Sequence, residues 1–190
     1  MIAGRAEIVT SIVGALRLWK GDPQALELFD RSLEGFWRSF FAAVLAAPAQ
    51  VLLLFVSGTR PTFAQNWPRM AAVETIAYVI SWTAYPLAMV FVADWIGRGS
   101  RYFDYMVPYN WAGLVQLLVL LAAEIIHASG LLPEPISEIL QLIAFIAVLH
   151  FQWFIARIGL EVSATAAVAL VLMDLFLGVL IDSLAASIRG

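Results

Sequence analysis

The sequence predicts an all-α, polytopic membrane protein: five transmembrane helices preceded by one or two amphipathic interfacial helices. Hydrophobic residues make up 62% of the 190 residues and charged residues only 13%, whereas soluble domains are close to half apolar and a quarter charged. Five stretches reach the roughly 20 mainly apolar residues that a bilayer-spanning helix needs. The segments between them are short and rich in Gly, Pro and Ser, so we expect a single bundle.

The first 36 residues are expected to form amphipathic helices on the cytoplasmic side. Over residues 6–19, apolar side chains recur at helical spacing and charged side chains fall off that face. A second helix is expected after Asp22, an N-cap residue, with Pro23 at its first position. Such helices lie in the membrane interface. They serve either as an anchor packed on the bundle or as a docking surface for a cytosolic partner.

The remaining chain is predicted to form five spans, residues 37–57, 71–96, 106–127, 136–156 and 163–185, and a short tail, residues 186–190. Their orientation is predicted from the excess of Lys and Arg that cytoplasmic loops carry. With the N-terminus inside, eight such residues lie on the cytoplasmic side: Arg5, Arg17, Lys20, Arg31, Arg38, Arg98, Arg101 and Arg157. Three lie on the other side: Arg60, Arg69 and Arg189. We therefore expect a protein of the cytoplasmic (inner) membrane with its C-terminus outside.

The order of segments resembles the Yip1-type membrane protein superfamily, whose members have five spans and a short Gly-rich basic loop between spans two and three. The best likeness is "FVADWIGRGSRYFDYMVPYNWAGLVQLLVLL", Phe91–Leu121, where the next helix begins after an aromatic residue and a proline. "HFQWFIARIGLEVSATAAVALVLMD" resembles the closing half of bacterial members, and "GDPQALELFDRSLEGFWRSFFAAVLAAP" resembles inner-membrane proteins of alphaproteobacteria. The resemblance implies a protein that acts through partners, as eukaryotic members do with small GTPases in vesicle traffic. It transfers no catalytic residue.

Polar residues at mid-membrane depth are candidates for a functional site, because ionisable groups inside a bilayer are costly and face protein or water. At about 1.5 Å per residue, Asp174 lies about 16 Å into the last span, and His150 lies about 10 Å from the cytoplasmic end of the fourth. The candidate intramembrane site consists of Ser81, Thr83, Gln116, His150 and Asp174. Asp174 is either a neutral or hydrogen-bonded packing tie, or a carboxylate that binds a proton or cation.

The residues around Asp174 predict that its side chain faces the bundle interior. Residues three or four apart share a helix face, and this face consists of Ala166, Ala167, Leu170, Asp174, Gly178 and Asp182. Small residues on it let a neighbouring helix approach closely. The carboxyl is therefore expected near Gln116 and His150 rather than in lipid.

The basic loop between the second and third spans is a candidate for holding a lipid phosphate. It consists of Arg98, Gly99, Ser100 and Arg101. The alternative is an ordinary positive-inside loop. After the fourth span, Arg157 and Glu161 are four residues apart and are expected to form a helix-end ion pair.

Several function classes are disfavoured by what the sequence lacks. There is no cysteine, which rules out disulfides, thiolate catalysis and Cys-ligated zinc. The motifs of serine hydrolases, P-loop NTPases and zinc proteases are missing. We expect no enzyme activity, no cofactor and no metal site. Without a basic stretch, we also expect no nucleic-acid partner.

The lipid bilayer is the expected partner of the protein. Three functions remain open. The first is a structural or membrane-organising role of Yip1-like type, acting through a membrane or cytosolic protein partner. The second is a small oligomeric transporter or channel that uses the midplane polar layer. The third is an accessory subunit of a larger membrane complex.

Overall fold

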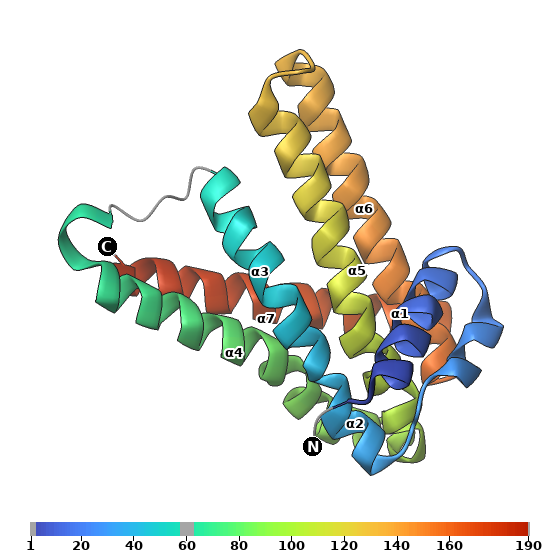
Figure 1. The fold of residues 1–190 in the computed structure, drawn as a ribbon. Coiled ribbons are helices and arrows are strands. Elements are labelled where there is room, and N and C mark those ends of the chain that lie inside the picture. Colours follow the sequence, from blue (N-terminus) through green and yellow to red (C-terminus); the bar gives the residue numbers. More distant parts are fainter. Residues whose placement is uncertain (1–2, 58–62, 190) are drawn as a thin grey trace.

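The computed structural model describes residues 3–57 and 63–189, with the backbone alone for residues 63–67 and 189 (Figure 1). The helices are α1 (Arg5–Trp19), α2 (Leu33–Ser39), α3 (Phe41–Val56), α4 (Phe63–Trp95), α5 (Tyr102–Ser129), α6 (Glu134–Gly159) and α7 (Ala164–Arg189), with two 3-10 turns, η1 (Pro23–Leu28) and η2 (Gly99–Arg101). These described residues contain no strand. The predicted all-α fold is confirmed.

Five helical segments among the described residues are long and apolar enough to cross a membrane. They are Leu33–Val56, Pro68–Trp95, Gly99–Ser129, Glu134–Gly159 and Ala164–Ile188. The chain therefore has the architecture of a multi-pass membrane protein, as predicted. Each segment is longer than the predicted span, because the helices continue into polar residues that a search for apolar runs leaves out.

The predicted second amphipathic helix is broken into two pieces. The Asp22 carboxylate accepts a hydrogen bond from the Gln24 backbone N–H at 3.0 Å and starts the turn η1, at Pro23 as expected. The Asp30 carboxylate then accepts the Ser32 backbone N–H at 3.1 Å. Such local bonds favour a turn over a continuous helix. The first membrane-spanning segment consequently begins with α2 rather than at residue 37.

The long helices form two arms that meet at one end and spread apart at the other (Figure 1). In one arm α4 packs along α7, and in the other α5 packs along α6. α3 packs on α5, on the side of the opening. The connections at residues 96–101 and 160–163 both lie where the arms meet, and we call this end of the bundle the base.

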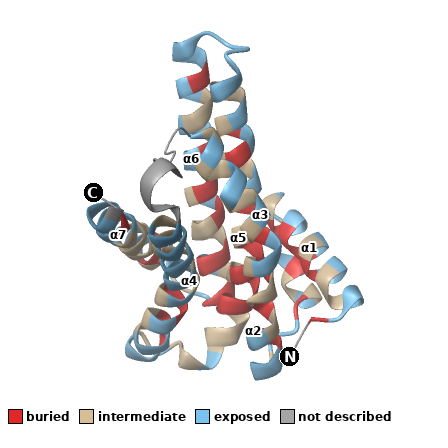
Figure 2. Cartoon of the chain, turned by 60° about the vertical axis from the view of Figure 1, so that its left-hand side comes forward, coloured by how far each residue is buried: buried red, intermediate tan, exposed pale blue. Residues whose placement is uncertain are grey.

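The hydrophobic core fills the base, where buried residues of both arms and of α1 gather (Figure 2). Trp111, Met106 and Ile155 are at most 1% exposed. α5 and α6 approach so closely that a Cβ on Gly159 would lie 2.9 Å from the Cα of Tyr105. Close packing of this kind stabilises helix contacts in lipid, which is itself as apolar as the side chains. The base therefore holds the arms together.

The N-terminal region packs against the base. α1 lies on α5 and α6, and α2 lies on α5. One face of α1 buries Ala15 and Leu18, whereas Val9 and Val13 on the other face are 61% and 45% exposed. Apolar residues on both faces suit a helix with protein on one side and lipid on the other. This packing favours the anchor alternative for the N-terminal region.

Ion pairs fasten the N-terminal region to the base. The Arg38 Nε of α2 donates to the Glu7 carboxylate of α1 at 2.9 Å, and the same guanidinium pairs with Asp30. Arg31 Nη1 lies 3.2 Å from the Asp104 carboxylate of α5. These pairs connect α1 to α2, and the turn before α2 to α5, across more than 30 residues of sequence.

Candidate intramembrane polar site

Asp174 of α7 lies at the centre of hydrogen bonds from two other helices. Its Oδ2 accepts from the Tyr109 hydroxyl of α5 at 2.8 Å and from Gln152 Nε2 of α6 at 2.9 Å. Gln152 Nε2 also donates to Oε1 of Gln116, on α5, at 3.3 Å. Within the described part of the chain, no Lys, Arg or His pairs with Asp174. The carboxyl therefore points into the bundle and ties α7 to α5 and α6.

Tyrosines extend these polar contacts toward the base. The Tyr85 ring of α4 lies against Tyr109, with 4.9 Å between the ring centroids. Its hydroxyl lies 2.7 Å from the Tyr105 hydroxyl. Tyr85 and Tyr105 are each 1% exposed, so their hydroxyls need partners inside the protein. We call the whole set the Asp174 cluster: Tyr85, Tyr105, Tyr109, Gln116, Gln152 and Asp174.

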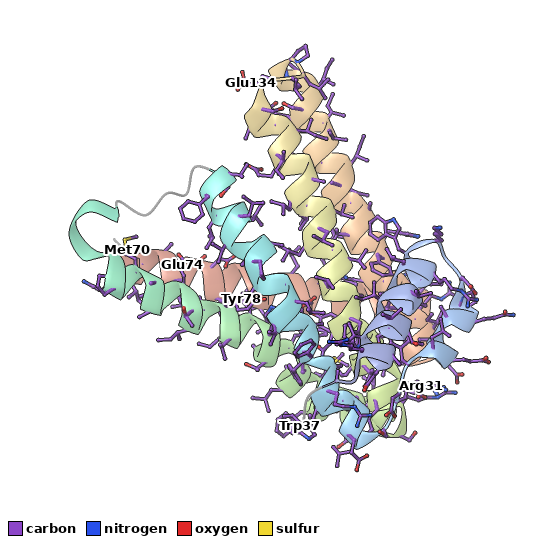
Figure 3. All side chains as sticks on the ribbon, viewed as in Figure 1. Arg31, Trp37, Met70, Glu74, Tyr78 and Glu134 are labelled. Atoms are coloured by element: carbon purple, nitrogen blue, oxygen red, sulfur yellow. The ribbon has the colours of Figure 1, made fainter. Side chains whose placement is uncertain are left out.

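A cavity of about 240 Å³ opens between the arms beside this cluster. Its polar lining comes from Gln50, Glu74, Tyr78, Ser81, Gln116 and Asp182. Figure 3 shows Glu74 and Tyr78 on the part of α4 that faces α3. A water molecule occupies about 30 Å³ in the liquid, so this volume suits water or a small polar solute.

Gln116 connects the cavity to Asp174. The side chain lines the cavity, and the residue is 8% exposed. Its Oε1 accepts from Gln152, whereas its Nε2 has no hydrogen-bond partner among the residues described. A buried donor left unpaired costs about 1–3 kcal/mol, so this amide favours an oxygen acceptor in the cavity. Polar groups thus run from the cavity to the carboxylate.

His150 does not join the Asp174 cluster, although it was predicted to lie near Asp174. It is exposed, and its ring stacks on Trp153 with 5.4 Å between the centroids. Residues two apart point to opposite sides of a helix. Because Gln152 faces Asp174, His150 faces away from it. Depth along the helix axis did not fix the direction of the side chain.

Ser81 and Thr83 also make no hydrogen bond to the Asp174 cluster. Ser81 donates to the Tyr78 carbonyl at 2.8 Å and Thr83 to the Val79 carbonyl at 2.9 Å, both within α4. Both side chains are exposed. Ser81 lines the cavity, so it belongs to the surroundings of the site, whereas Thr83 does not.

The small-residue face of α7 is packed most closely near the base. Ala167 is fully buried and Leu170 is 5% exposed. A Cβ on Gly178 would meet no atom within 4 Å, so the close helix approach predicted there is wrong. α7 runs on beside α4 at this point, and the arms spread (Figure 1). Asp174 therefore lies near the place where the arms separate.

The basic loop does not present two available arginines. Arg101 pairs with Asp104 at 3.1 Å and with Glu161. The predicted pair of Glu161 with Arg157 is absent: α6 has ended by residue 161, and the Arg157 guanidinium lies 5.3 Å over the Trp153 ring. One of the two arginines of the loop is thus already paired with carboxylates. This weakens the loop as a phosphate site.

Gln152 and Tyr109 are the residues that sequence reasoning missed. On α6, the buried residues Ala144, Val148 and Ile155 mark the inward face, and Gln152 follows Val148 by four positions. Tyrosines repeat at helical spacing on α5 as well. If the inward face of each helix had been identified from its repeat, and combined with depth along the helix, both residues could have been predicted.

The Asp174 cluster offers one carboxyl group, three hydroxyls and two amides. These groups can bind a proton and can donate or accept hydrogen bonds. No group of three or more His, Asp or Glu side chains comes together as a metal site in the described ranges.

Comparison with known proteins gives no relative for this site. No protein-family model, no curated protein and no solved structure matches the chain. The Yip1-type resemblance therefore stays a prediction from the sequence.

Proposed function

We propose that the protein moves protons across the membrane, with Asp174 as the group that binds the proton. The observation that carries this proposal is the row of polar groups from the cavity through Gln116 and Gln152 to Asp174. An ionisable residue inside a membrane is expensive and typically marks an ion pathway or proton relay. This proposal takes up the second function that the sequence left open, a small oligomeric transporter or channel.

Protonation changes what Asp174 does where the arms separate. The charged carboxylate accepts hydrogen bonds from Tyr109 and Gln152, and charge-assisted bonds are about twice as strong as neutral ones. A bound proton removes the charge and weakens this tie between α7 and the other arm. Proton binding is thereby coupled to the spacing of the arms.

Tyrosines lie between Asp174 and the base: the Tyr109 hydroxyl donates to Asp174, and the Tyr109 ring lies against that of Tyr85. A hydroxyl both donates and accepts, so neighbouring hydroxyls can pass a proton. The Tyr85 and Tyr105 hydroxyls lie 2.7 Å apart.

We place the protein in the cytoplasmic (inner) membrane with its N-terminus inside and its C-terminus outside. With this orientation, eight Lys and Arg residues lie on the cytoplasmic side and three on the other side, as the positive-inside rule requires. The cavity then opens outward, and the tyrosines of the Asp174 cluster lie toward the cytoplasm. Alkaline phosphatase fused to the C-terminus should be active; an inactive fusion would contradict the orientation.

A membrane-organising role of Yip1-like type, acting through partners, is the second candidate. It is favoured by Leu33 and Trp37 on α2, which are 55% and 59% exposed at the end that carries the N-terminus. Exposed apolar residues at this level suit the membrane interface or a protein partner. Wild-type protein that moves no protons would leave this role as the better account.

The proposal is tested by proton flux into proteoliposomes that contain a pH-sensitive dye. A potassium gradient with valinomycin makes the lumen negative, and wild-type protein should then acidify it faster than protein-free vesicles do. Asp174→Asn is expected to fold, because asparagine keeps an oxygen acceptor at this position. Its flux should fall to the protein-free rate, because an amide does not bind a proton at neutral pH.

The matched control is Glu138→Gln, which removes an exposed carboxylate from α6. This variant should keep the wild-type flux. Wild-type flux no greater than that of empty vesicles would overturn the proposal, and so would undiminished flux through Asp174→Asn.

A further inference from the structure

A second pocket, of about 310 Å³, lies between the end of α1 and α6. Its lining consists of Leu18, Trp19, Lys20, Gly21, Ala147, His150, Phe151 and Phe154. Pockets that bind small molecules start at about 300 Å³. This one is separate from the Asp174 cluster, because His150 faces away from Asp174.

The rim of this pocket carries positive charge that no carboxylate neutralises in the described part of the chain. Lys20 is the single lysine of the sequence, and its side chain is exposed without an ion pair among the described residues. Asp22, two residues further on, is paired with Arg17 at 2.5 Å. His150 adds a ring that can donate a hydrogen bond. The rim is therefore suited to an anion.

The floor of the pocket is apolar, and an apolar surface continues from it along α6. Trp19 meets Phe151 edge to face, with 5.1 Å between the ring centroids. Beyond His150, on the same face of α6, Ile146 and Ile143 are 55% and 57% exposed. A hydrocarbon chain can lie on this stripe, which a free anion would not use.

The pocket lies where a bilayer surface meets the protein. The turn after α1 carries exposed polar groups, including Lys20, Gly21 and Gln24. Such residues do not lie in the hydrocarbon region, because that region has no water to hydrogen-bond with exposed backbone and charged groups. His150, across the pocket, belongs to a segment that is apolar enough to span the membrane. The boundary between headgroups and hydrocarbon therefore passes through the pocket.

We propose that this pocket binds one acidic phospholipid. The Lys20 ammonium pairs with the headgroup phosphate, and His150 donates to the oxygen atoms of the glycerol esters beneath it. One acyl chain lies over Phe154 and along Ile146 and Ile143. Lipid binding here is independent of proton movement through Asp174.

Native mass spectrometry of the full chain in detergent tests this site. The protein is titrated with phosphatidylglycerol or with phosphatidylcholine of the same acyl chains. A one-to-one complex should form more tightly with phosphatidylglycerol, and excess inorganic phosphate should not displace the lipid. Lys20→Gln should weaken phosphatidylglycerol binding about fivefold, the typical contribution of one basic residue at an acidic membrane surface. Adding His150→Gln should weaken it further.

Arg5→Gln is the matched control, because it removes one positive charge from an exposed position at the start of α1, the helix that Lys20 follows. It should bind phosphatidylglycerol as the wild type does. Unchanged affinity in Lys20→Gln would overturn the proposal, as would an equal loss in Arg5→Gln or equal affinity for the two lipids. Displacement of the lipid by inorganic phosphate would show a plain anion site and would also contradict it.

Discussion

Replacing Asp174 with leucine should lower the free energy of unfolding by about 2–4 kcal/mol. The Tyr109 hydroxyl loses its acceptor, which costs about 1–3 kcal/mol, and Gln152 Nε2 loses one of its two hydrogen bonds, which costs about 1 kcal/mol. The unfolding free energy is measured by titration with a denaturing detergent.

Two other variants separate this effect from a general loss of charge. Asp174→Asn keeps an oxygen acceptor and should lose about 1 kcal/mol, the net contribution of one hydrogen bond. Glu138→Leu removes an exposed carboxylate from α6 and should change stability little. If Asp174→Leu is as stable as Asp174→Asn, the carboxylate does not tie the arms together.

Replacing Arg38 with glutamine should release α1 from the base. The Arg38 guanidinium donates to the Glu7 carboxylate at 2.9 Å and joins α2 to α1 across 31 positions of sequence. The Asp30 carboxylate is 42% exposed, so solvent screens that pair more strongly. Backbone amides of α1 should therefore exchange hydrogen for deuterium faster, while those of α5 and α6 stay protected. Exchange in α1 as slow as in the wild type would show that packing alone holds this helix.

The pH dependence of this tie follows from Asp30. Hydrogen bonding from Ser32, together with the Arg38 guanidinium, lowers the pKa of the Asp30 carboxyl below 3.8. Because the pKa is lowered in the folded state, the ionised Asp30 carboxylate stabilises the fold fully at pH values above its unfolded pKa of about 3.9. This stabilisation is lost only as the pH falls through the lowered pKa of the folded state. The exchange measurement on Arg38→Gln is therefore made at neutral pH, with Arg5→Gln as a control.

The spans were predictable because a bilayer requires long apolar runs, and those runs are visible in the sequence. The inward direction of Asp174 was predictable for a related reason, since a carboxylate facing lipid is too costly. Neither argument specifies how helices cross. The spread of the arms beyond Gly178 depends on packing at the base, which hydropathy does not encode.

The partners of Asp174 were only partly predictable. Depth selected Gln116 correctly, but it also selected His150 and passed over Gln152, two positions away on the opposite side of α6. The long-range ion pair of Arg38 with Glu7 joins helices whose contact is set by tertiary packing. No local spacing rule identifies such a pair.

Infrared difference spectroscopy across a pH change is the most direct test of Asp174 as a proton-binding group. Wild-type protein in lipid should show a carbonyl band of a buried carboxylic acid that appears as the pH is lowered and disappears as it is raised. Asp174→Asn should lack this band, whereas Glu138→Gln should retain it. A spectrum of Asp174→Asn that matches the wild type, or a wild-type band that does not respond to pH, would contradict the assignment.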